Sequence, residues 1–276
     1  MHAQGCPHRR PRIVFPAVWA MSVAVVAAGC GFGPLPGRAT EEWTRTYPLS
    51  PGGEVRIGNT NGKVEIEGVD GSTVEVRAEK IARAATDEGA RQLLPKVTII
   101  EDTKPDRVSI ETGRISGMLI GARYEVDYHV RAPKTALITA RTTNGVVILS
   151  GLTGKVVART TNGGVRATDL RGPVDASSTN GAVSVDLASV GGDRIALSTT
   201  NGGVTLNVPD TAKADVVATW TNGGMNVDGL HVDVSERSRR RFEGKLNGGG
   251  TPIELHTTNG GIRLRARGGE AQRTEK

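Results

Sequence analysis

The sequence predicts an all-β fold, specifically a β-solenoid (a parallel β-helix or β-roll) of 18–21-residue coils with a short helix inserted near the N-terminal end. Three observations predict it. The tripeptide Thr-Asn-Gly occurs seven times, apolar and polar residues alternate on both sides of each copy, and equivalent positions carry similar residues. Similarity that extends to small polar positions favours stacking of the copies on one another. A series of antiparallel hairpins is the alternative, because Asn-Gly is also a strong hairpin signal.

The asparagines of the seven copies form the framework of the predicted solenoid. They are Asn61, Asn144, Asn162, Asn180, Asn201, Asn222 and Asn259. Steps of 18, 18, 21, 21 and 37 residues separate the last six, and the longest step is close to two coils with a loop inserted. Stacked Asn side chains can hydrogen-bond along a column at a spacing of ~4.8 Å. We therefore expect two ladder neighbours for Asn180, and only one for Asn259 in the last coil.

Four aligned positions around each Asn, here called columns, hold no charged residue. They lie six and four residues before the Asn and three and five residues after it, and each holds only apolar residues. This period-two alternation predicts two short strands that meet at the Asn-Gly turn and face a common core. The glycine after each Asn favours positive φ, which we expect at Gly163, Gly181 and Gly202. The threonine just before each Asn can hydrogen-bond nearby backbone.

Composition limits both the core and the partners. Aromatic residues make up 3% of the chain and 37 of its 276 residues are glycine, so we expect a thin core of Val, Ile, Leu and Ala. The net charge is +6 and falls to +3 without Arg9, Arg10 and Arg12, which precede the predicted cleavage site. This excess of positive charge does not indicate a nucleic-acid partner.

The N-terminus has the features of an export signal. Residues 1–29 contain a basic start and an apolar run, and they end in Val-Ala-Ala-Gly before Cys30. This ending resembles the lipobox of bacterial lipoproteins and implies that Cys30 is lipidated and anchors the chain to a membrane. Residues 30–53, rich in Gly and Pro, are predicted to be a flexible tether. The absence of Asp beside Cys30 favours, by the same resemblance, the outer membrane or cell surface; the periplasmic face stays open.

The remaining chain divides into three parts. Residues 54–137 are predicted to be an irregular N-terminal section or cap, with one repeat and a helix that starts at Thr86-Asp87-Glu88 and ends at Pro95. Residues 138–267 are predicted to be the repetitive solenoid. Residues 268–276 are predicted to be a disordered tail.

The Thr-Asn-Gly turns, the segment Tyr-Glu-Val-Asp-Tyr-His-Val-Arg-Ala-Pro at 124–133 and the helix insert resemble a widespread bacterial cell-envelope family. Its members are labelled "putative adhesins" or domains of unknown function. The resemblance covers roughly residues 40–267 and implies a β-helical or β-roll-like fold. It implies no catalytic residues.

The sequence contains few candidate catalytic or ligand-binding residues. We find no nucleophile or phosphate-binding motif, and His129, His231 and His256 have no metal-ligand spacing, so we predict no catalytic residues, metal or cofactor. A basic segment, 235–245, could bind an anionic surface, although a solvated insertion is favoured. Its basic residues are Arg237, Arg239, Arg240, Arg241 and Lys245.

Three function classes follow. The first is a non-enzymatic envelope lipoprotein whose rigid solenoid is an adhesion, binding or scaffold surface for envelope polymers or another envelope protein. The second is a sensory or regulatory partner in an envelope-stress system. The third, a carbohydrate-active β-helix enzyme, is disfavoured by the scarcity of aromatics and the lack of a carboxylate pair.

Overall fold

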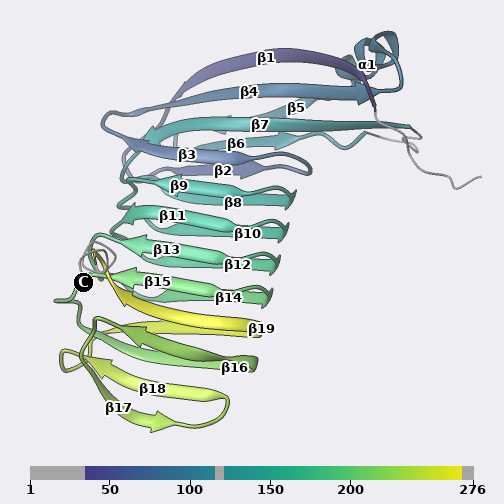
Figure 1. Cartoon of the computed structure of the whole chain (residues 1–276). Coiled ribbons are helices and arrows are strands. Elements are labelled where there is room, and N and C mark those ends of the chain that lie inside the picture. Colours follow the sequence, from purple (N-terminus) through teal and green to yellow (C-terminus); the bar gives the residue numbers. More distant parts are fainter. Residues whose placement is uncertain (1–34, 116–120, 269–276) are drawn as a thin grey trace, which may run out of the picture. The chain divides into compact units, whose positions relative to one another are not determined.

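The computed structural model of the chain describes residues 35–115 and 121–268, all within one compact unit. The predicted signal peptide, Cys30 and residues 269–276 lie outside the described residues. Regular structure in the described part is almost entirely β-strand, with one short α-helix, which confirms the predicted fold class (Figure 1). No helix in this part of the chain is long and apolar enough to cross a membrane.

Four coils form the regular middle of the solenoid. Each has one strand before its Asn-Gly turn and one after it: β8 Leu137–Asn144 and β9 Val147–Ser150, β10 Val156–Asn162 and β11 Val165–Leu170, β12 Val174–Asn180 and β13 Val183–Leu187, β14 Ile195–Asn201 and β15 Val204–Val208. The strands before the turns pair in parallel with one another, and so do the strands after the turns. The coils therefore build two parallel sheets, here called the first and the second sheet, which rules out serial hairpins for this region.

The core between the two sheets is thin and aliphatic, as predicted. Val156 and Ala158 of the first sheet are buried, as are Val165 and Ala167 of the second, and the same pattern repeats in the coils above and below. The buried aromatic side chains among the described residues are confined to the two ends of the stack, Tyr128 at one and Trp220 and Phe242 at the other. Small side chains in the repeated columns allow identical coils to stack without gaps.

The N-terminal end is assembled out of chain order. The first Thr-Asn-Gly coil consists of β2 Glu54–Gly58 and β3 Val64–Val69. It is stacked between the coil of β8 and β9 and a coil made of β6 Arg107–Thr112 and β7 Ala122–Pro133, which come later in the chain. Antiparallel strands then extend both sheets. In the first sheet β5 Ile99–Lys104 pairs with β6, and in the second β4 Thr73–Ala84 pairs with β7 and β1 Gly37–Pro48 pairs with β4. The helix α1 Asp87–Leu93 and a 3-10 turn Leu94–Lys96 lie at the end of β1, β4 and β7 (Figure 1).

The predicted tether of residues 30–53 is too long. Residues 37–48 are the strand β1, paired along its whole length with β4. The sequence pattern does not indicate this strand, because an edge strand contacts the rest of the protein on one face only. Within β1 only Trp43 and Tyr47 supply large side chains to that face. The helix, in contrast, begins at Asp87 as predicted, with Thr86 accepting a hydrogen bond from the Gly89 N–H at 3.1 Å.

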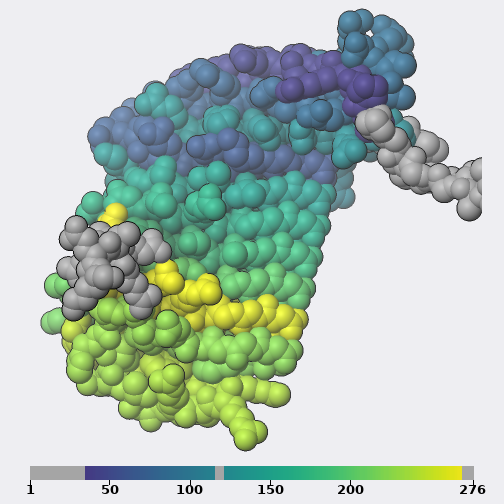
Figure 2. All heavy atoms as spheres, viewed as in Figure 1, coloured from purple at the N-terminus to yellow at the C-terminus, as the bar shows by residue number. Residues whose placement is uncertain are grey.

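The C-terminal end is also out of chain order, and here one expectation was wrong. Beyond β15 the chain forms β16 Ala214–Asp228, β17 Val232–Arg237, β18 Arg241–Leu246 and β19 Thr251–Ala266. β19 returns between β14–β15 and β16 and pairs in parallel with all three (Figure 2, yellow between two green coils). Asn259 therefore lies inside the ladder, and the outermost Asn is Asn222. The 37-residue step contains the hairpin β17–β18, which pairs with β16 and covers the end of the core.

Candidate binding surface

The seven turn asparagines form one continuous ladder of side-chain hydrogen bonds. In spatial order it runs Asn61, Asn144, Asn162, Asn180, Asn201, Asn259 and Asn222, with N···O distances of 2.7, 2.8, 2.8, 2.9, 2.8 and 2.8 Å. Except at Asn61, each Nδ2 donates to the Oδ1 of the preceding Asn in this spatial order, so the amide dipoles all point the same way. A chain of aligned amides polarises each member and holds the side chains in one rotamer.

A second ladder of hydroxyl groups lies just inside the first. It uses the residue two positions before the Asn and not, as expected, the one immediately before it. Thr160, Ser178, Thr199 and Thr257 are buried and donate to a turn-glycine carbonyl in the neighbouring coil at 2.7–2.9 Å. Trp220 occupies this position in β16, so the hydroxyl column ends at the last coil.

The turn glycines are needed mainly because neighbouring coils approach closely. Gly163 has the expected positive φ, 146°, but Gly181 and Gly202 are not among the positive-φ residues, so the expectation was wrong for these two. A Cβ on Gly181 would lie 1.9 Å from the Gly163 carbonyl oxygen, and one on Gly202 would lie 2.3 Å from that of Gly181. Parallel stacking at the turn thus leaves no room for any side chain.

The outer edge of the turns is an uncharged polar surface, which we call the turn stripe. It comprises Thr143, Asn144, Thr161, Asn162, Thr179, Asn180, Thr200, Asn201, Thr258, Asn259, Thr221 and Asn222, nearly all of them exposed. The threonines are not among the described side chains that form hydrogen bonds, and each ladder amide retains one N–H and one lone pair beyond its ladder bonds. The stripe therefore has unused hydrogen-bonding capacity at a fixed repeat.

The repeated coils place this protein in a family. The sequence profile of the family described as Toastrack DUF4097 matches residues 119–265, from just before β7 almost to the end of β19. The chain belongs to the Toastrack family. This confirms the predicted resemblance to a family of domains of unknown function. Among proteins with curated descriptions, none matches the chain.

Several solved structures are similar to this Toastrack chain. A "putative cell adhesion protein" from Clostridium sporogenes is 13% identical, with 82% of this chain and 100% of that chain covered and a TM-score of 0.45. A "putative adhesin" from Bacteroides fragilis is 10% identical, with 82% and 97% covered and a TM-score of 0.36.

The basic segment of the Toastrack chain forms the hairpin β17–β18. Arg241 is neutralised by ion pairs to Glu236 and Glu243. Lys245 lies in register between Asp215 and Asp233. Arg237, Arg239 and Arg240, at the hairpin tip, and Lys245 on β18 are exposed without an ion pair to another described residue. The structure therefore brings three of the five predicted basic residues together as free charges.

The histidines do not form a site. His129 lies 3.2 Å from Glu65, His231 lies 3.6 Å from Asp233, and His256 shares a 2.9 Å hydrogen bond with Thr219, each on a different part of the surface. Within residues 35–115 and 121–268, no group of His, Cys, Asp and Glu is arranged to hold a metal ion.

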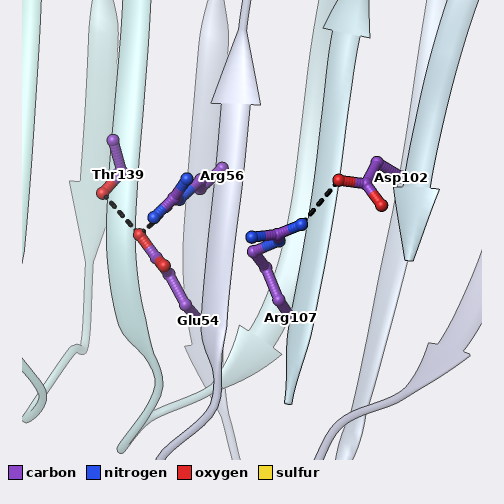
Figure 3. A network of polar contacts seen from close by, with 5 residues as sticks. All are labelled: Glu54, Arg56, Asp102, Arg107 and Thr139. Atoms are coloured by element: carbon purple, nitrogen blue, oxygen red, sulfur yellow. Dashed lines mark hydrogen bonds and ion pairs between the residues drawn. The ribbon is translucent and has the colours of Figure 1, made fainter. Parts of the chain in front are cut away.

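Polar side chains also cross the outer face of the first sheet near its N-terminal end (Figure 3). Glu54 accepts hydrogen bonds from Arg56 at 2.6 Å and Thr139 at 3.2 Å, and Arg107 donates to Asp102 at 2.6 Å. The bond from Arg56 holds the pKa of Glu54 below its usual value. The Thr139–Glu54 bond joins β8 to β2, and the Arg107–Asp102 bond joins β6 to β5, whereas the Arg56–Glu54 bond lies within β2.

Proposed function

We propose that this protein is a non-enzymatic, lipid-anchored component of the bacterial cell envelope and that its turn stripe binds an uncharged, hydroxyl-rich envelope polymer such as a glycan strand. The observation that carries the proposal is the stripe itself. Amide and hydroxyl groups recur in it at the strand spacing of ~4.8 Å, and no ionisable side chain interrupts it.

Rigidity supports this role. The ladder bonds and the buried hydroxyl bonds fix each Asn side chain and its turn, so little conformational entropy is lost when a partner binds. Repetition adds to the effect, because a polymer that contacts one coil is already positioned over the next.

The binding test compares two faces of the same coils. The full-length lipoprotein is pelleted with purified cell-wall sacculi, and so are two double variants. Thr179→Glu/Thr200→Glu places carboxylates on the stripe, and Ser184→Glu/Thr205→Glu places them on the outer face of the second sheet in the same two coils. We expect the stripe variant to lose binding and the control variant to keep it. Equal pelleting of both variants would show that the stripe is not the binding surface.

The anchor is tested separately, since Cys30 lies outside the described residues. Wild type and Cys30→Ser are partitioned between detergent and aqueous phases. We expect wild type in the detergent phase and the variant in the aqueous phase or unprocessed. Identical partitioning would refute lipid anchoring while leaving the binding surface untouched.

A further inference from the structure

Three arginines occupy one cross-strand row at the N-terminal end of the second sheet. Arg38 of β1 is directly opposite Arg83 of β4, and Arg83 is directly opposite Arg123 of β7. Residues in direct register lie on the same face of a sheet, about 5 Å apart. The alternate residues Ala82 and Tyr124 pack toward α1, so the arginine row lies on the opposite, open face.

The arginine row is only partly neutralised. Arg38 forms one ion pair, 3.4 Å from Glu79. Arg83 and Arg123 have no ion pair to any described residue, and Arg123 is exposed. Farther along the same face, Arg131 lies between Glu67 and Glu75. Like charges directly opposite each other destabilise a sheet, so the row is unfavourable for folding alone and suited to an external anion.

The position of the row identifies the anion. Arg38 is the second residue of β1, and Gly37 is only seven residues after Cys30. Seven residues span at most roughly 25 Å even when fully extended. If Cys30 carries the lipid, as the proposed function holds, this end of the solenoid is kept within that distance of the membrane surface, where the anions are phosphate groups of lipids.

We propose that the arginine row seats the N-terminal end of the solenoid on the phosphate-bearing head groups of anionic lipids. Guanidinium groups bind phosphate oxygens through paired N–H donors, and three in a row can contact adjacent head groups. The contact would hold the solenoid at a fixed orientation to the membrane, with the basic hairpin tip at the far end of the stack. This inference rests on the proposed lipid anchor for its choice of partner.

The test removes the anchor so that head-group binding alone is measured. Protein that begins at Gly31 lacks both the predicted signal peptide and Cys30 but keeps the whole compact unit, and it is floated with vesicles of phosphatidylglycerol and, separately, of phosphatidylcholine. We expect binding to phosphatidylglycerol only, and release by high salt, because exposed charges are screened within about 3 Å at 1 M. Basic residues near an anionic leaflet each add roughly fivefold in affinity, so Arg38→Gln/Arg83→Gln/Arg123→Gln should weaken binding by roughly 100-fold.

The matched control is Arg237→Gln/Arg239→Gln/Arg240→Gln, which removes the same charge from the hairpin tip at the opposite end. We expect it to bind phosphatidylglycerol like its parent. Replacing the row by lysines should retain most of the binding and shows that a loss with glutamine is not a folding defect. The inference is overturned if both triple variants lose binding equally, if the row variant loses none, or if phosphatidylcholine binds as well. Failure of the detergent-partition test would refute the anchor without changing these outcomes.

Discussion

Truncation of single ladder asparagines tests the spatial order of the coils. Asn180 has a hydrogen bond on each side, 2.8 Å to Asn162 and 2.9 Å to Asn201, whereas Asn222 has one, 2.8 Å to Asn259. A net contribution of about 0.5–1 kcal/mol per exposed neutral bond gives a loss of about 1–2 kcal/mol for Asn180→Ala and about half that for Asn222→Ala. Asn259→Ala, with bonds to both Asn201 and Asn222, should resemble Asn180→Ala.

Urea unfolding followed by circular dichroism gives the free energy of unfolding for each variant. Thr179→Ala is the control, since Thr179 is an exposed neighbour of Asn180 on the same strand, and it should change stability by less than about 0.5 kcal/mol. The chain order of the coils predicts that Asn259→Ala is the mild variant; the structure predicts that Asn222→Ala is. If Asn259→Ala costs less than Asn222→Ala, or if Asn180→Ala matches its control, the ladder described above does not exist in solution.

Three further predictions follow from the turns and the buried end of the core. Gly181→Ala, whose Cβ would lie 1.9 Å from a carbonyl oxygen, should lower the free energy of unfolding by about 1–3 kcal/mol, while Gly191→Ala, with nothing within 4 Å, should be near neutral; equal effects would contradict the close-approach argument. Thr199→Val removes the buried 2.8 Å bond to the Gly181 oxygen and should cost about 1–3 kcal/mol by thermal unfolding, more than the exposed Thr200→Val. Burial raises the pKa of Tyr128 from 10 to about 12. The stability that the protonated phenol contributes is therefore fully present below pH 10 and is lost as the pH rises toward 12. Tyr128→Phe should reduce this loss of stability at alkaline pH, and an unchanged pH profile would exclude Tyr128 as its source.

The coils could be predicted because each carries its own complete pattern. The alternation around Asn162 defines which side chains face the core, and the identical pattern around Asn180 defines the stacking partner and the register. The strand β1 could not be predicted in this way, since it has no copy elsewhere and buries one face only. The arginine row escaped sequence reasoning for a related reason: its members come from three non-repeated strands whose register the sequence does not specify.

The position of β19 is hard to predict because Asn201, Asn222 and Asn259 carry interchangeable motifs. Any of these coils could stack on any other in the same register. One signal was present: Trp220 replaces the hydroxyl residue of the inner ladder, and an indole ring there suits a coil that ends the stack and not one in its middle. Reading that substitution together with the 37-residue step would have indicated β16 as the terminal coil.

The return of β19 into the stack imposes an order on folding. β16 and the β17–β18 hairpin precede residues 251–266 in the chain, so during folding β16 can meet the exposed edges of β14 and β15 first, with a compatible motif. Direct docking of β16 there is a kinetic trap, because the final strand can enter only after those contacts separate. At high protein concentration two chains can exchange β19, each inserting it between β14–β15 and β16 of the other. The same strand position that completes the monomer therefore also allows domain-swapped dimers.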